Sequence, residues 1–143
     1  MRILFVDDEI SHATVVSGLL RTVLDAEVEI VTSVAQAVRA LHEHPVDLVI
    51  TDLFIPLGES ADQLLGPRAR RYREHVPHLG SLVLLDELDQ VTPSPIVLAH
   101  TACTEAAVFE ALGGRVSGRI MKPAGAEVML RGVLLALGLP VPG

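Results

Sequence analysis

The chain has 143 residues, the usual size of one compact domain, and this length is enough to bury a substantial core. Its 18 acidic and 11 basic residues leave a net charge of −7, which argues against direct nucleic-acid binding, since that needs a basic face. Hydrophobic residues make up 50% of the chain and aromatic residues only 3%, so a core of Val, Leu, Ile and Ala is expected, as in a parallel sheet covered by helices.

Export and membrane insertion are not indicated by the sequence. Cys103 is the only cysteine and cannot form a disulfide within the chain. We find no charged and then apolar leader, and no apolar run of about 18 residues. A cytoplasmic location without membrane contact is therefore expected.

The first part of the chain alternates predicted strands with amphipathic helices. Residues 3–6 form an apolar run that stops at acidic residues, and helical spacing over residues 16–24 follows, with Ser11 as its expected cap. Strands are predicted over residues 28–31 and 46–51, and the helical pattern between them begins at a cap in Ser33. The third strand ends on the carboxylate of Asp52.

The same alternation returns in the last third of the chain. A strand over residues 96–99 runs into His100 and Thr101, and the helical pattern that follows stops at a glycine cap, Gly113-Gly114. Residues 120–121 form the core of a fifth strand that ends at Lys122, and residues 125–138 form the last helix. Right-handed crossovers then predict an α/β fold, a doubly wound five-stranded parallel sheet flanked by helices, with ligands outside the carboxyl ends of the strands.

Residues 57–78 interrupt this rhythm, because the next apolar helix does not begin until Leu79. We expect a helical insertion here, after the third strand, within a single domain spanning residues 1–143. The pattern of residues 60–63 resembles a capping box, and Gly66-Pro67 places proline where a helix often starts, so one or two short helices are predicted. The arginines of the insertion suit an ordinary solvated helix face, and partner docking is the alternative reading.

Five side chains lie at the carboxyl ends of predicted strands and are expected to meet in one crevice: Asp7, Asp8, Asp52, Thr101 and Lys122. Three neighbouring carboxylates repel one another unless a cation joins them, and oxygen ligands of this kind suit Mg²⁺. One carboxylate can then attack phosphorus while the metal and an ammonium group neutralise the transferring oxygens. Lys122 is the only lysine of the chain, which favours a role for a compact point charge there.

These residues resemble the receiver domains of bacterial response regulators, which have a flavodoxin-like fold. The resemblance rests on the acidic pair Asp7-Asp8, on Asp52 with proline four residues later, and on the pairs Thr101-Ala102 and Lys122-Pro123. It covers the whole chain except roughly residues 57–78. A metal-dependent phosphohydrolase would need an acid/base carboxylate two residues after its nucleophile, where this chain has Phe54, so we rank that reading last.

The resemblance implies that Asp52 accepts a phosphoryl group from a histidine kinase or a histidine phosphotransfer protein. Mg²⁺ would be held by Asp8, Asp52 and the main-chain carbonyl of Phe54, with Asp7 reaching it mainly through water. Lys122 and Thr101 would contact the phosphoryl group, and the Lys122-Pro123 peptide would be cis. Such a domain catalyses only its own phosphorylation and dephosphorylation and is not an enzyme toward other substrates.

Signal output is expected to pass to a downstream protein effector or an output domain, because nothing follows the last predicted helix. A phosphorylation-dependent homodimer is one form that this output could take. Arg119 stands where the family usually has a switch aromatic and is free to swing toward acidic partners. The alternative function is a receiver-like protein-binding module that works without phosphorylation, and the intact acidic and lysine positions argue against it.

Overall fold

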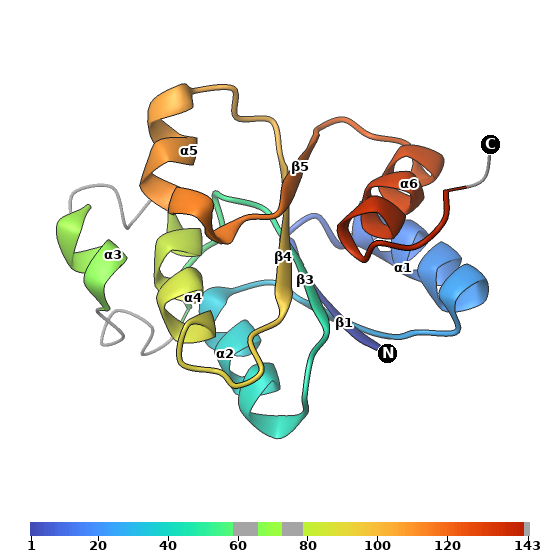
Figure 1. Ribbon diagram of the computed structural model, residues 1–143, viewed down its shortest axis with the longest axis horizontal. Helices are drawn as coiled ribbons and strands as arrows, with labels where there is room; N and C mark the ends of the chain where they lie inside the picture. Colours follow the sequence, from blue (N-terminus) through green and yellow to red (C-terminus); the bar gives the residue numbers. More distant parts are fainter. Residues whose placement is uncertain (59–65, 73–78, 142–143) are drawn as a thin grey trace.

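The computed structural model describes residues 1–58, 66–72 and 79–141 of the chain (Figure 1). Its five strands all run parallel in one sheet and are β1 (Arg2–Val6), β2 (Glu27–Val31), β3 (Leu48–Thr51), β4 (Ile96–Thr101) and β5 (Gly118–Met121). Within the same residues the helices are α1 (Ile10–Leu24), α2 (Val34–Glu43), α3 (Pro67–Arg71), α4 (Gly80–Leu88), α5 (Ala106–Leu112), the 3₁₀ turn η2 (Gly113–Arg115) and α6 (Ala126–Ala136).

The strand order is β2-β1-β3-β4-β5. The chain begins at β1, the second strand of the sheet, forms the edge strand β2, and then crosses back past β1 to build β3, β4 and β5. The winding direction therefore reverses between β1 and β3, and such a reversal leaves a crevice outside the strand ends. The predicted doubly wound parallel sheet is confirmed.

Helices cover both faces of the sheet. Figure 1 shows α1 and α6 on one side and α2, α4 and α5 on the other. Alternate strand residues serve the two cores: Phe5 and Ile50 pack with the α1 and α6 side, whereas Leu4, Val6 and Val49 pack with the opposite side. Because each of these strands is buried on both faces, its sequence is a continuous apolar run instead of an alternating one.

The cap predictions for the first two helices had different outcomes. Ser33 caps α2 as predicted, and its hydroxyl accepts the N–H of Gln36 at 3.2 Å. Ser11 was wrong as a cap, because α1 already begins at Ile10 and Ser11 lies inside its first turn. The reason is a tight turn after β1, in which the Asp7 carboxylate accepts the N–H of Glu9 at 2.9 Å. That turn brings the chain into the helix two residues earlier than expected.

Element boundaries follow the pairing between strands. β3 was predicted to begin at Val46 but begins at Leu48, because Leu48 is the first residue that pairs with β1, opposite Ile3. β4 extends through Thr101 because its last residues pair with β5. The helix α5 ends at Gly113, which has a positive φ of 67° and serves as the predicted glycine cap.

Between β3 and α4 the structure describes one additional short helix, α3. It begins at Pro67 after Gly66, as predicted from the sequence. The capping-box pattern over residues 60–63 and most of the predicted insertion lie outside the described residues. The main chain of Gly66 passes so close to α4 that an added Cβ would lie 2.6 Å from the Cβ of Asp86.

Among the described residues, no helix combines the length and the apolar character that are needed to cross a bilayer.

Candidate functional site

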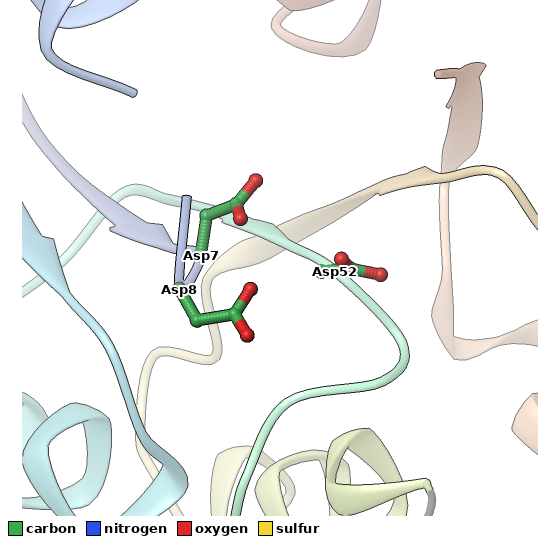
Figure 2. A group of neighbouring side chains, drawn as sticks. All are labelled: Asp7, Asp8 and Asp52. Carbon is green, nitrogen blue, oxygen red and sulfur yellow. The ribbon is translucent and has the colours of Figure 1, made fainter. Parts of the chain in front are cut away.

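Two neighbouring strands deliver three carboxylates to the same edge of the sheet. Asp7 and Asp8 directly follow β1, and Asp52 directly follows β3. The main chain fixes both strand ends, since Asp7 N donates to the carbonyl of Val31 and Asp52 N donates to the carbonyl of Val6, each at 3.0 Å. Figure 2 shows the three side chains grouped at this edge. The strand order places them beside the winding reversal between β1 and β3.

The three carboxylates are close enough to share one cation. One oxygen from each of Asp7, Asp8 and Asp52 lies within 4.8 Å of the other two. Asp7 is fully buried and Asp52 nearly so, whereas Asp8 is exposed and leaves the group open on one side. An all-oxygen group with one open side suits Mg²⁺, which keeps several waters when it binds. The three carboxylates predicted as metal ligands are thus brought together.

The main chain of Phe54 lies beside the same group of carboxylates. Its N–H donates to Asp52 Oδ1 at 3.3 Å, and its side chain is 46% exposed. This hydrogen bond holds the turn after β3 against the Asp52 carboxylate. The main-chain carbonyl of Phe54 as a metal ligand stays a prediction.

Lys122 joins the group from the end of β5. Its Nζ lies 2.9 Å from Asp52 Oδ2 and 3.1 Å from Asp7 Oδ2, so one ammonium group bridges two carboxylates. Its main-chain N–H donates to the carbonyl of Thr101 at 2.9 Å, which ties β5 to β4. The predicted cis Lys122-Pro123 peptide is present.

Thr101 ends β4, the strand that lies between β3 and β5. It is fully buried, and its hydroxyl oxygen accepts the N–H of Cys103 at 3.2 Å. Because the oxygen accepts in this bond, the hydroxyl hydrogen is left to donate elsewhere. The five predicted side chains therefore come from the ends of β1, β3, β4 and β5 at one edge of the sheet.

The charges of Asp7 and Lys122 stabilise each other. Burial raises the pKa of Asp7, but the contacts with His100, the Glu9 N–H and Lys122 outweigh burial and hold that pKa below its usual 3.8. Burial lowers the pKa of Lys122, but Asp52 and Asp7 outweigh burial and raise it above its usual 10.5. At neutral pH Asp7 is therefore a carboxylate and Lys122 an ammonium group.

From the sequence, His100 was assigned no role. The ring of His100 is fully buried, and its Nδ1 lies 3.8 Å from Asp7 Oδ2. The ring of His12 lies against it, with 5.3 Å between the ring centres. A cavity of about 360 Å³ adjoins both rings and Lys122. The signal in the sequence was a histidine directly before Thr101, at the end of an apolar strand.

Within the described part of the chain Arg119 forms no ion pair with an acidic residue, although its position had suggested one. Its guanidinium group lies 4.4 Å from the ring centre of Phe109 and so connects β5 to α5 by a cation–π contact. A cation stacked on a ring of the neighbouring helix thus stands at the position where the family that the motifs resemble usually has an aromatic residue.

Solved structures of receiver domains have the same fold. A CheY-like response regulator receiver domain protein from Methanospirillum hungatei JF-1 gives a TM-score of 0.72 at 18% identity, covering 96% of this chain and 93% of that chain. The signal receiver domain of a putative Luxo repressor protein from Vibrio parahaemolyticus gives 0.69 at 20% identity, covering 96% and 89%. A two-component response regulator from Clostridium difficile gives 0.70 at 14% identity, covering 96% of each chain. No protein-family model and no curated protein matches the sequence.

The chain therefore has the fold of response-regulator receiver domains. The resemblance predicted from the motifs is confirmed at the level of the fold. The acidic group and Lys122 lie at the carboxyl edge of that sheet, where the motifs had placed them.

Proposed function

We propose that this chain is a response-regulator receiver whose Asp52 accepts a phosphoryl group in a Mg²⁺-dependent reaction. The donor would be a histidine kinase or a histidine phosphotransfer protein. The observation that carries the proposal is the bridge from Lys122 Nζ to Asp52 Oδ2, at 2.9 Å, within a group of three carboxylates. The receiver fold supports the same conclusion.

Asp52 is a better acceptor than either of its acidic neighbours. Asp7 is fully buried, and its two oxygens face the Glu9 N–H and Lys122. Asp8 is exposed and has no ion pair with Lys122 among the described residues. Asp52 combines partial access, since its side chain is 12% exposed, with a bound ammonium group. It alone offers a reachable oxygen beside a positive charge.

In the proposed reaction an Asp52 carboxylate oxygen attacks the phosphorus atom of a phosphohistidine. The new O–P bond forms as the P–N bond breaks, and the histidine of the donor leaves with the electron pair of that bond. Lys122 neutralises one phosphoryl oxygen and Thr101 donates its hydroxyl hydrogen to another. Asp8, Asp52 and the Phe54 carbonyl would hold a Mg²⁺ ion directly and Asp7 mainly through water, and the ion would supply further positive charge to the phosphoryl oxygens.

Phosphorylation would then act as a signal inside this chain and not as catalysis on other substrates. The added group shifts a two-state equilibrium of the domain only as far as it binds one state more tightly than the other. A protein effector or an output domain would read that shift, and self-association is one form the reading could take. The proposed location of this chemistry is the cytoplasm.

Intact-mass spectrometry after incubation with acetyl phosphate tests the proposal. The wild type should gain one phosphoryl group with Mg²⁺ and none with a chelator, and Asp52→Asn should gain none. Asp25→Asn is the matched control, because Asp25 is an exposed C-cap of α1 at φ 51°, a conformation that asparagine tolerates. A folded wild type that stays unmodified would favour the phosphorylation-independent binding module instead.

A further inference from the structure

His100 presents a buried ring whose two nitrogens have no hydrogen-bond partner. The ring has no exposed surface, and neither Nδ1 nor Nε2 is hydrogen-bonded to any described residue. Buried polar groups in proteins are almost always paired, so an exception of this kind requires an explanation. The nearest charged atom is Asp7 Oδ2, which lies 3.8 Å from Nδ1.

Asp7 Oδ2 shares its positively charged partner, Lys122, with Asp52. Lys122 Nζ lies 3.1 Å from it and 2.9 Å from Asp52 Oδ2, and Oδ2 accepts no hydrogen bond from a described residue. The other oxygen of Asp7 already accepts the N–H of Glu9. If Lys122 turns fully toward a phosphoryl oxygen on Asp52, Asp7 Oδ2 loses its ammonium contact. Asp7 would reach the proposed Mg²⁺ mainly through water, so this buried oxygen would have no direct partner among the described residues. Such an atom is costly unless another donor replaces the ammonium group.

We propose that His100 is a positioning residue, which donates Nδ1–H to Asp7 Oδ2 when Lys122 leaves Asp7 for the phosphoryl group. The inference rests on the proposed function. A hydrogen bond needs a nitrogen-to-oxygen distance near 2.9 Å, so the present gap closes with a shift of roughly 1 Å. In the unphosphorylated chain Lys122 contacts this oxygen directly, and His100 acts on Asp7 only from 3.8 Å, without a hydrogen bond.

The surroundings of the ring support this role. Phe5 meets the His100 ring edge to face at 6.3 Å between ring centres, and the His12 ring lies 5.3 Å away, so two neighbouring rings restrict its orientation. The neighbouring cavity extends along His100 to Lys122, which leaves the lysine side chain room to change direction. The hydrogen bond therefore requires the Asp7 carboxylate to move slightly toward Nδ1, and it does not require the His100 ring to rotate.

The test compares binding of beryllofluoride, a phosphoryl mimic, with binding of Mg²⁺ alone. The variants are His100→Asn, whose amide nitrogen lies close to the position of Nδ1, His100→Gln, whose longer amide reaches the region of Nε2, and His100→Leu, which has no donor. Affinity for the mimic at saturating Mg²⁺ is measured by calorimetry and ¹⁹F NMR. Urea unfolding reports the stability of each variant.

We expect His100→Leu and His100→Gln to bind the mimic about 10-fold to 100-fold more weakly than the wild type, because a charge-assisted hydrogen bond is lost. His100→Asn should stay within about threefold of the wild type. Mg²⁺ affinity without the mimic should change much less, since Lys122 still contacts Asp7 in that state. A purely structural role would lower stability without this difference between the two ligands.

Several results would overturn the inference. One is that His100→Leu binds beryllofluoride as tightly as the wild type does. Another is that His100→Asn and His100→Gln weaken beryllofluoride binding equally. If His100→Leu does not fold, the comparison of the two amide variants decides alone. If the folded wild type takes up no beryllofluoride at saturating Mg²⁺, the proposed function itself is wrong, and the inference fails with it.

Discussion

The carboxylate of Asp86 on α4 accepts the main-chain N–H of Ala69 on α3 at 2.9 Å. It also accepts the N–H of Arg68 at 3.1 Å, so a side chain from one helix caps the first turn of another. The Arg68 side chain returns an ion pair to Asp86 and a second one to Asp89. This arrangement holds α3 against the C-terminal part of α4.

Replacing Asp86 by alanine should therefore loosen α3. The Asp86 side chain is 1% exposed, and its loss leaves the buried N–H of Ala69 and the partly buried N–H of Arg68 without an acceptor. The Arg68 side chain keeps its ion pair with Asp89. We expect the free energy of unfolding to fall by about 2–4 kcal/mol in urea denaturation. Asp89→Ala, at a side chain that is 44% exposed, should cost less than about 1 kcal/mol. Equal losses for the two variants would show that Asp86 is not a cap.

Two glycines should respond oppositely to alanine. A Cβ at Gly80, the first residue of α4, would lie 2.1 Å from the main-chain carbonyl oxygen of Ile55, so Gly80→Ala should lower stability by about 1–3 kcal/mol or more. A Cβ at Gly18, within α1, meets no atom within 4 Å, so Gly18→Ala should raise stability by about 0.5–1 kcal/mol. Urea midpoints that move in the same direction for both variants would contradict this reading.

Stability should depend on pH at both ends of the range, through Asp7 and Lys122. The folded-state pKa of Asp7 is below its usual 3.8, so its contribution is present above 3.8 and is lost as pH falls through the lower folded value. The folded-state pKa of Lys122 is above its usual 10.5, so its contribution is present below 10.5 and is lost as pH rises through the higher folded value. With a chelator present to remove metal, the difference in unfolding free energy between the wild type and Asp7→Asn should be constant near neutral pH and should shrink in acid. A difference that grows in acid would refute the assignment to Asp7.

Asp8 should contribute to Mg²⁺ affinity but not to the stability of the metal-free protein. It is exposed and adds negative charge beside Asp7 and Asp52. Asp8→Asn should weaken Mg²⁺ binding in calorimetry by more than about tenfold, the lower bound for changes next to metal ligands. In chelator the same variant should be as stable as the wild type, or slightly more stable, because a like-charge repulsion is reduced. An unchanged affinity for Mg²⁺ would remove Asp8 from the proposed ligand set.

The fold was predictable because each strand is a short apolar run that stops at a polar residue. Residues 3–6, 96–99 and 120–121 all end at side chains that the structure places at one edge of the sheet. Strand lengths were predicted less well, because the extent of β3, β4 and β5 depends on the register with a neighbour that is distant in sequence. The start of α1 was missed for a similar reason, since a side chain of the preceding turn fixes it.

The acidic and lysine positions of the site were predictable from residue type and strand position together. His100 and Asp86 were not, because their importance depends on burial and on partners in other elements. A histidine at a strand end and an aspartate within an apolar helix are ordinary surface features in a sequence. Only packing removes water from them and makes their pairing matter.

Lys122 and Asp52 are 70 positions apart along the chain, yet their side chains touch. A denatured polypeptide cannot assemble such a group, so any divalent ion that associates with it selects the native ensemble. By thermodynamic linkage, an ion present at a hundred times its dissociation constant would add about 2.7 kcal/mol to the unfolding free energy. The free concentration of that ion would then set the stability of the folded molecule as well as its chemistry.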